Sequence, residues 1–400
     1  MIKIPGPGET VELFIQKTVF GGDGLAVHEG KTCFVEGALP GERVLAEIFQ
    51  TKSNFSRARL VRVLAASQHR IESLCRYASH CGGCQYQHVE YAEELRLKEG
   101  QLAEILKIVP GLALEKISPI VPSPSAYGYR NGVTLHAVPS PAKGKGRKPS
   151  ARLGFIGKDN VSKIPVQSCL IADPRLVPVF GKEFLLRKET ESIVFKVSEQ
   201  GEIVADNPEK FFRIRIGEES FLTSSRGFFQ NNLAVSAALA ERVKKWVISA
   251  DPGIFFDLYA GVGVFSILCG RSARKIVCIE ESPESVQALG MNAEEKKIPL
   301  KIVQGRVEKK FQAVWESDGG EASFVVLDPP RQGLAPELAS YLAKNPGISS
   351  LAYVSCDPVT LARDLKILLS GGFWQVKEAV PFDMFPRTKH LETAVLLTAV

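Results

Sequence analysis

The chain has 400 residues, of which 45% are hydrophobic and 24% are charged. This composition excludes a wholly disordered or collagen-like chain, and the length predicts two or three domains. Fifty lysines and arginines against 44 acidic residues give a net charge of +6, too small an excess to prove a nucleic-acid partner by itself. No run of about 18 apolar residues is present and the N-terminus has no apolar signal region, so we expect a soluble, cytoplasmic protein with no membrane partner.

A first domain is expected over residues 1–66, as a small β-barrel. Short β-rich segments such as VELFIQKTVF and KTCFVEG alternate with turns such as GGDG, a pattern typical of small barrels that bind oligonucleotides. No acidic residue lies between Phe49 and Ile71, where five basic residues occur: Lys52, Arg57, Arg59, Arg62 and Arg70. A second basic run spans Lys143 to Arg152. We expect both stretches to contact phosphates if the chain handles RNA.

A middle domain is expected over residues 67–226, and it contains a suggestive group of cysteines. Three follow the spacing C-x5-C-x2-C and a fourth lies far along the chain; this four-cysteine set is Cys75, Cys81, Cys84 and Cys169. Four thiolates can hold zinc or an iron–sulfur cluster, and scattered core cysteines are the alternative. Cys269 and Cys278 lie in apolar runs and are expected in the core. A helix is predicted from Val89 to Ile108, because the helical periodicity ends before Pro110.

Residues 227–400 alternate between predicted helices and strands, and form the third expected domain. The predicted strands are IFFDLYAG, RKIVCIEES, ASFVVLDPPR and SLAYVSCDP, with helical segments between them. This alternation predicts a parallel sheet with helices on both faces, in which ligands bind beyond the carboxyl ends of the strands. The expected fold class is multidomain α/β: a barrel, a central α+β domain and a Rossmann-like domain.

The first strand end has the features of a nucleotide site. Its glycine loop contains Gly261 and Gly263, and Glu280 ends the next strand 23 positions after Asp257. That is about the separation at which a carboxylate meets ribose hydroxyls in such folds. A dinucleotide loop would have a third glycine where Ser266 stands, so the pattern favours S-adenosylmethionine.

Two later strand ends carry reactive groups. One ends in Asp328, and the other ends in Cys356, which is followed by Asp357 and Pro358. A cysteine acts as a nucleophile when its pKa is low or when a base assists it. Glu392, just before the predicted terminal strand, is the candidate base.

These segments together resemble the RNA uracil-5-methyltransferases, in the branch that carries a TRAM domain and an iron–sulfur cluster. The resemblance covers nearly the whole chain. It rests on YVSCDPVTLARDL, DMFPRTKHLETAVLL, LDPPRQGL, DLYAGVG and SFLTSSRGFFQNN, on the four-cysteine set, and on GGDGLAVHEGKTCFVEGALPGERV, which resembles the TRAM domain.

The resemblance implies S-adenosylmethionine-dependent methylation of carbon 5 of a uridine in RNA, with a [4Fe-4S] cluster on the four-cysteine set. Cys356 would add to carbon 6 of the uracil, and Glu392 would remove the proton from carbon 5. The cofactor-binding residues implied are Gln230, Tyr259, Gly261, Gly263, Glu280 and Asp328. Arg130 and Phe228 are the implied substrate contacts, and Phe229 and Tyr129 are further candidates to stack on bases.

Two departures from the family pattern concern the cofactor: Val264 stands where Asn is frequent, and Arg306 falls near a usual Asn or Asp. Among relatives, a TRAM domain with a cluster indicates large-subunit (23S) ribosomal RNA as the substrate of a monomeric enzyme, whereas some modify the T-loop uridine of transfer RNA. A non-catalytic iron–sulfur RNA-binding protein is the alternative of another class. A radical S-adenosylmethionine enzyme fits less well, because it would use C-x3-C-x2-C spacing and leave one iron open.

Overall fold

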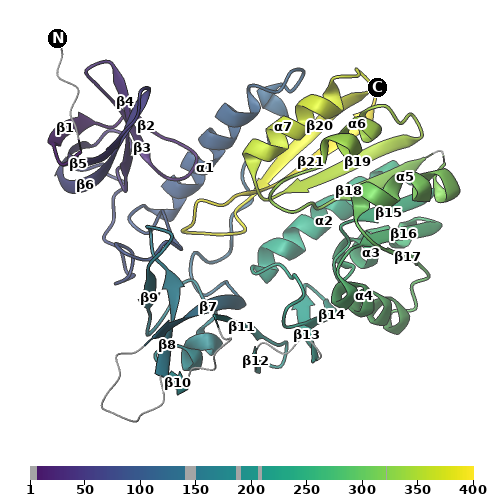
Figure 1. Ribbon diagram of the computed structural model, residues 1–400. Helices are drawn as coiled ribbons and strands as arrows, with labels where there is room; N and C mark the ends of the chain where they lie inside the picture. Colours follow the sequence, from purple (N-terminus) through teal and green to yellow (C-terminus); the bar gives the residue numbers. More distant parts are fainter. Residues whose placement is uncertain (1–6, 140–149, 186–190, 206–209, 321) are drawn as a thin grey trace. The chain divides into compact units, whose positions relative to one another are not determined.

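A computed structural model describes residues 7–139, 150–185, 191–205, 210–320 and 322–400 (Figure 1). The chain forms two compact units. The first comprises Met1–Leu102, Ile156–Ser162 and Pro386–Lys389, and the second comprises Ala103–Phe155, Lys163–Phe385 and His390–Val400. Within the described residues, no helix is long and apolar enough to cross a membrane.

The first unit begins with a six-stranded sheet in the hydrogen-bonded order β1-β5-β6-β4-β3-β2. Its strands are β1 (Thr10–Phe14), β2 (Lys17–Thr18), β3 (Gly24–His28), β4 (Lys31–Glu36), β5 (Arg43–Thr51) and β6 (Phe55–Ala65). Side chains of β5 alternate between buried and accessible positions, as a strand with one face on a core requires. β1 also packs against β3, so the sheet curls around a core that includes Leu13, Ala26, Val35 and Ala46.

The helix α1 (Tyr91–Leu106) follows and confirms the helix predicted over 89–108. Between the curled sheet and α1 runs the segment with three of the predicted cluster cysteines. The cysteine loop, residues 75–84, is closed by backbone hydrogen bonds from Ala78 to Cys75 (3.0 Å) and from Cys81 to Tyr77 (2.8 Å).

The second unit contains a smaller sheet in the order β10-β8-β7-β11-β12, with β9 paired to β8, and the hairpin β13–β14. These strands are β7 (Gly132–Pro139), β8 (Ser150–Ile156), β9 (Lys163–Pro165), β10 (Glu183–Leu185), β11 (Ser192–Val197), β12 (Ile203–Ala205), β13 (Phe211–Ile216) and β14 (Glu219–Ser224). Two short 3-10 helices, η1 (Leu114–Lys116) and η2 (Pro174–Val179), lie in the same region of the chain.

A seven-stranded sheet in the order β17-β16-β15-β18-β19-β21-β20 dominates the second unit (Figure 1). Its strands are β15 (Ile254–Leu258), β16 (Lys275–Glu280), β17 (Lys301–Gln304), β18 (Ser323–Leu327), β19 (Ile348–Ser355), β20 (Trp374–Phe382) and β21 (Glu392–Ala399). The helices are α2 (Leu233–Ala250), α3 (Val264–Leu268), α4 (Pro283–Glu295), α5 (Val307–Asp318), α6 (Pro336–Ala343) and α7 (Pro358–Leu369), and the short 3-10 helix η3 (Gly270–Ser272) follows α3.

The predicted alternation of strands and helices is confirmed, and the four predicted strands β15, β16, β18 and β19 are parallel as expected; the direction of the terminal strands was not predicted. β21 runs antiparallel to both β19 and β20, because the chain returns from β20 at the sheet edge and inserts between them. β17 and α5 were not predicted either. The sheet nevertheless begins at a central strand and reverses its order between β15 and β18, which is where α/β sheets bind ligands.

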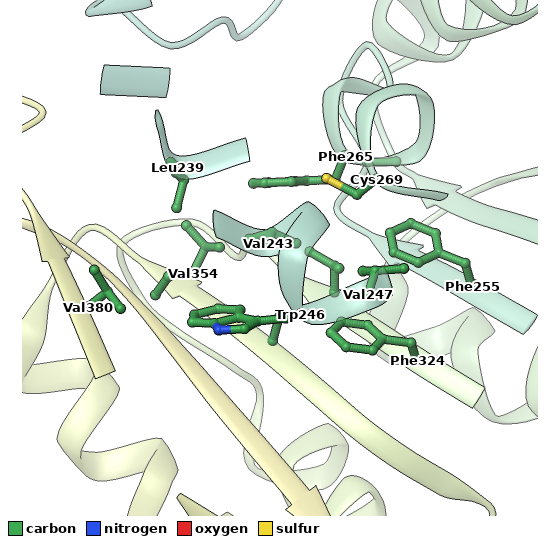
Figure 2. Close-up of a cluster of buried hydrophobic side chains, with 14 of the residues drawn as sticks. Leu239, Val243, Trp246, Val247, Phe255, Phe265, Cys269, Phe324, Val354 and Val380 are labelled. Carbon is green, nitrogen blue, oxygen red and sulfur yellow. The ribbon is translucent and has the colours of Figure 1, made fainter. Parts of the chain in front are cut away.

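The core of this unit lies between α2 and the sheet (Figure 2). Val243 and Val247 of α2 are fully buried beside the rings of Phe255 and Phe324, whose centroids are 6.2 Å apart. Cys269 belongs to the same cluster and Cys278 is fully buried, which confirms the prediction that both are core residues. This packing holds the strands rigidly, so that their carboxyl ends form a fixed edge.

Candidate active site

Three parallel strands and one antiparallel strand bring the predicted catalytic groups to one edge of the large sheet. β15, β18 and β19 pair in register, and Asp328 and Cys356 directly follow the last two of them. β21 runs the other way, so its first residue, Glu392, lies at the same edge, and its second, Thr393, pairs with Ser355. The structure therefore brings together Cys356 and Glu392, the predicted catalytic pair, and places Asp328, a predicted cofactor residue, beside them.

Cys356 is a protonated thiol in this environment. Burial raises the pKa of the thiol to about 12, and the negative charges of Glu392 and Asp328 act in the same direction. Arg331 is the nearby group that lowers the pKa of Cys356. A thiol has to lose its proton when it forms a bond to a substrate, so this environment disfavours the reactive thiolate form of Cys356.

Glu392 is a buried carboxyl group, only 1% exposed, and not the surface carboxylate that its sequence neighbourhood alone would suggest. Among the residues that the structure describes, its Oε1 atom has no hydrogen-bond partner. Burial raises the pKa of Glu392 well above its ordinary value, and Asp328 raises it further. The pKa of Asp328 is raised in turn by burial and by Asp257. A carboxylate with a raised pKa is a stronger base, which suits proton removal from carbon near neutral pH.

The glycine loop after β15 is folded for close approach of a ligand. Gly261 and Gly263 have φ angles of +55° and +88°, and Tyr259 also has a positive φ of +66°. A Cβ atom at Gly261 would meet nothing within 4 Å, so open space lies beside the backbone there. Asp257 is fully buried below the loop and accepts hydrogen bonds from the backbone N–H of Ser266 (2.8 Å) and from its hydroxyl.

The other predicted cofactor residues flank this loop. Glu280 accepts hydrogen bonds from the backbone N–H groups of Gly261 (2.8 Å) and Ser282 (2.7 Å), so its carboxylate ties the loop to the end of β16. The hydroxyl of Tyr259 donates to Glu308 (2.8 Å), a residue that the sequence analysis missed. Of the two departures from the family pattern, Val264 begins α3, and Arg306 precedes α5 and lies 3.6 Å from Glu308.

Gln230 and Arg130 come from neighbouring segments. Arg130 forms a β-bridge with Asn232, and the N–H of Asn131 donates to the carbonyl of Asn231 (3.0 Å). Lys196, also missed by the sequence analysis, donates from its buried ammonium group to the carbonyl oxygens of Gly227 and Ser224. Burial lowers the pKa of this lysine to about 8.

The aromatic residues of this region differ in their exposure to solvent. Phe228 is 65% exposed and Phe229 only 5%. Phe228 is therefore free of the core and available to stack on a base, whereas Phe229 packs against Phe221 in a buried cluster. Tyr129 is half-buried.

Arg331 and its supporting contacts were also missed. α7 starts two residues after Cys356, and its side chains hold the loop that carries Arg331. Asp364, fully buried, accepts from the N–H of Leu334 (2.8 Å) and from the hydroxyl of Tyr353 (2.7 Å), and Thr360 donates to the carbonyl of Arg331 (3.2 Å). A buried aspartate on the apolar face of a predicted helix is the signal that could have indicated this role.

The four-cysteine set is divided between the two units. Cys75, Cys81 and Cys84 belong to the cysteine loop of the first unit, and Cys169 belongs to the second. Burial raises the pKa of the Cys81 thiol, and the charge of Cys75 contributes. Within the described part of the chain, no group of three or more His, Cys, Asp or Glu side chains is arranged to hold a metal ion.

The basic stretch on β6 differs from its prediction in part. Arg57 forms an ion pair with Asp23 (2.7 Å), and Arg70 with the buried Glu42 (2.5 Å), so the expectation of positive charge without nearby acids is wrong for both. Arg59 and Arg62 are exposed, and Arg59 lies over the ring of Phe49. Of the second basic run, residues 140–149 lie outside the described residues, and Arg152 lies 3.3 Å from Glu183.

Comparison with known proteins identifies the family. Residues 204–400 match the family described as tRNA (Uracil-5-)-methyltransferase, and residues 7–61 match the TRAM domain. An uncharacterised RNA methyltransferase of Thermotoga maritima is 30% identical over 96% of this chain and 98% of its own length. The chain belongs to the RNA uracil-5-methyltransferase family. A second methyltransferase of this kind, from Bdellovibrio bacteriovorus, is 29% identical over 98% of this chain and 95% of its own.

The fold of this methyltransferase is also that of a solved structure. The tRNA (uracil-54, C5)-methyltransferase of Pyrococcus abyssi, in complex with S-adenosyl-L-homocysteine, superimposes with a TM-score of 0.71. The superposition covers 97% of this chain and 100% of that one, at 21% identity. The expected TRAM and methyltransferase domains are thus confirmed. The boundaries at 66/67 and 226/227 stay predictions.

Proposed function

We propose that the protein methylates carbon 5 of a uridine in 23S ribosomal RNA, through a covalent bond between Cys356 and carbon 6 of the uracil. The observation that carries this proposal is the convergence of Cys356, Asp328 and Glu392 at one sheet edge, with electrostatic effects of each carboxyl group on the thiol. Burying these three groups together makes ionisation of each one unfavourable, because the charge of one opposes ionisation of the others. Binding RNA without catalysis does not require such an arrangement.

The glycine loop fits S-adenosylmethionine, because Gly261 leaves open space and Glu280 stands at the end of the neighbouring strand. Gln230, Tyr259, Gly263 and Asp328 are the further residues proposed to hold it. When bound, S-adenosylmethionine supplies an electrophilic methyl group.

The residues of the chain supply the remaining chemistry. Carbon 5 of uracil is a weak nucleophile. As the Cys356 thiol gives its proton to water, its sulfur adds to carbon 6 and moves the electrons of the C5–C6 double bond onto the carbonyl oxygen as an enolate. Carbon 5 then has carbanion character and takes the methyl group. The Glu392 carboxylate removes the proton from carbon 5, and the electrons of that C–H bond expel the sulfur from carbon 6. The uridine has to leave its stack to reach buried groups, and Phe228 and Arg130 are proposed to contact it.

The four-cysteine set is proposed to bind a structural [4Fe-4S] cluster. The support is its resemblance to the family's ligands and the presence of three of the four thiols on one loop; no catalytic step is assigned to the cluster. Transfer RNA is the second candidate substrate, since the structural neighbour from P. abyssi modifies position 54 of tRNA. Mapping 5-methyluridine in RNA from cells lacking the protein distinguishes the two, because only the true substrate loses the modification.

The mechanism is tested by trapping. Total RNA from cells that lack the protein and were grown with 5-fluorouracil should form a denaturation-resistant complex with the protein, since fluorine cannot leave as a proton does. Cys356→Ala should form none. Cys278→Ala, which alters a fully buried cysteine of the same sheet, should form the complex as the unaltered protein does. A complex that survives in Cys356→Ala would refute the assignment of the nucleophile.

Glu392→Gln separates the two steps. With unsubstituted RNA it should still transfer the methyl group, because Cys356 is intact, but release the RNA slowly and accumulate a covalent complex. Gel electrophoresis under denaturing conditions measures the complex, and tritium from the methyl donor measures the transfer. Normal release by this variant would exclude Glu392 as the base.

A further inference from the structure

Lys196, on β11, places an ammonium group in the interior of the second unit. The residue is 8% exposed, and its Nζ atom donates to the backbone carbonyl oxygens of Ser224 (3.4 Å) and Gly227. Burial lowers the pKa of this amine to about 8, so the group is still largely charged at neutral pH although its burial costs free energy. Ionisable groups buried at such a cost are concentrated at functional sites, and the two carbonyl groups indicate what this one does.

Both carbonyl groups lie in the segment that leads to Phe228. We call residues 224–229 the Phe228 loop. Gly227 directly precedes Phe228, so the carbonyl group of Gly227 and the N–H of Phe228 belong to one planar peptide unit. The N–H of Gly227 also donates to the hydroxyl oxygen of Ser224 (2.8 Å), which closes the turn from within. The bond from Lys196 therefore fixes the orientation of the peptide unit from which Phe228 projects.

Other contacts hold the chain beyond Phe228. Phe229, the next residue, is 5% exposed and packs in a buried cluster. Two residues further on, the carbonyl oxygen of Asn231 accepts a hydrogen bond from the N–H of Asn131 (3.0 Å). Gln230, a proposed cofactor residue, lies between these two contacts. Lys196 thus holds the part of the segment before Phe229, and independent contacts hold the part after it.

We propose that Lys196 is a positioning residue that directs the ring of Phe228 toward an RNA base. Phe228 is 65% exposed, so the backbone that carries the ring, and not packing around it, sets its direction. A ring that is already held in place binds a base more tightly, because binding does not have to order it. This inference rests on the proposed function, because it takes Phe228 to contact the RNA.

The test combines Lys196→Met and Phe228→Ala in a double-mutant cycle in the full chain. The measurement is the rate of trapping on 5-fluorouracil-substituted total RNA from cells lacking the protein, at low RNA concentration. Phe228→Ala should slow trapping by about 5- to 150-fold, the effect expected from the loss of one stacked base. Lys196→Met, which keeps an apolar chain and removes the ammonium group, should slow it by about 5-fold or more. In the Phe228→Ala background it should change the rate little, because the ring that it positions is gone.

Two further measurements distinguish positioning from a general loss of structure. The affinity of Lys196→Met for S-adenosylmethionine, measured by calorimetry without RNA, should equal that of the unaltered protein, since Gln230 lies beyond Phe229. Lys296→Met is the matched control. Lys296 is only 10% exposed and donates to Glu219 (2.7 Å) at the opposite end of β14 from the Phe228 loop. This control should trap RNA at the normal rate, and equal slowing in it would overturn the inference.

The remaining outcomes separate the inference from the proposed function. Normal trapping by Lys196→Met, with slow trapping by Phe228→Ala, overturns the inference and leaves the proposed function in place. Additive slowing in the double variant, or a loss of cofactor affinity in Lys196→Met, indicates a merely structural role and also overturns it. Normal trapping by Phe228→Ala removes the proposed stacking contact, and the inference with it. If the unaltered protein traps no RNA, the proposed function itself is overturned together with the inference.

Should Lys196→Met fail to fold by circular dichroism, Gly227→Ala replaces it in the cycle. A Cβ atom at Gly227 would lie 3.0 Å from Oγ of Ser224 and 3.3 Å from Oγ1 of Thr223, so the same peptide unit has to shift while Lys196 stays in place. Slower trapping that disappears in the Phe228→Ala background supports the inference. Normal trapping, or slowing that adds to that of Phe228→Ala, overturns it.

Discussion

Replacing Gly261 and Gly263, in the loop after β15, each by alanine and comparing the two variants separates the cost of backbone strain from the cost of steric overlap. Both glycines have positive φ, which costs an L-residue about 1–2 kcal/mol. They differ in the space around them: a Cβ atom at Gly263 would lie 2.2 Å from Cδ1 of Leu289, whereas one at Gly261 would meet nothing within 4 Å. Leu289 is fully buried on α4, and side chains in a close-packed interior have little room to move.

Gly261→Ala should therefore lower the free energy of unfolding of the second unit by about 1–2 kcal/mol. Gly263→Ala should lower it by about 2–5 kcal/mol, since overpacking in a core adds about 1–3 kcal/mol to the backbone cost. Urea denaturation followed by tryptophan fluorescence measures this unit selectively, because all three tryptophans, Trp246, Trp315 and Trp374, belong to it.

A second substitution tests the cause of the difference. Leu289→Ala removes the atom that the new Cβ would strike, so it should cost less in the Gly263→Ala background than in the unaltered protein. Equal losses of stability for the two glycine variants would refute the reasoning, and so would strict additivity of Gly263→Ala with Leu289→Ala.

Three further results are expected. Burial raises the pKa of Asp257 from 3.8 to about 6, so the folded protein keeps this proton to a higher pH than the unfolded chain does. The free energy of unfolding should therefore fall by roughly 3 kcal/mol as pH rises from about 4 to about 6. Asp257→Asn should remove this part of the pH dependence. Protein purified without oxygen should be brown, with about four irons per chain on the four-cysteine set, and stoichiometric zinc without iron would contradict the cluster. Neutralising Arg59 and Arg62 should reduce the slope of log affinity for RNA against log salt concentration by about 0.7–0.9 per lost phosphate contact. Arg57→Ala should change this slope little, because Asp23 already pairs with that arginine. An unchanged slope after neutralising Arg59 and Arg62 would exclude β6 as a phosphate-binding surface.

Local sequence patterns predicted the features that depend on neighbouring residues. α1, α2, α4, α6 and α7 follow from apolar periodicity and from signals such as Pro110. The strand ends with Asp328 and Cys356 follow from β-rich runs that stop near a proline. Residue identity also predicted which groups would react. A thiol beside a strand end and a carboxylate in a matching motif indicate covalent chemistry before any distance is known.

Only the tertiary structure decided the features that depend on residues far apart in the chain. β21 lies between β19 and β20 because of strand pairing across the sheet, which no local signal encodes, and β17 was too short to stand out. The same holds for charge: Arg57 has no acidic neighbour in sequence, yet Asp23, 34 residues earlier, pairs with it.

The candidate site shows the same division most clearly. The sequence by itself predicted Cys356 and Glu392 as the reacting groups and Asp328 as a cofactor-binding residue. It did not determine that Glu392 is buried, or that burial, together with the charges of Glu392 and Asp328, raises the pKa of the Cys356 thiol. Ionisation depends on the burial and charges that surround a group in space, so these properties exist only once the chain is folded.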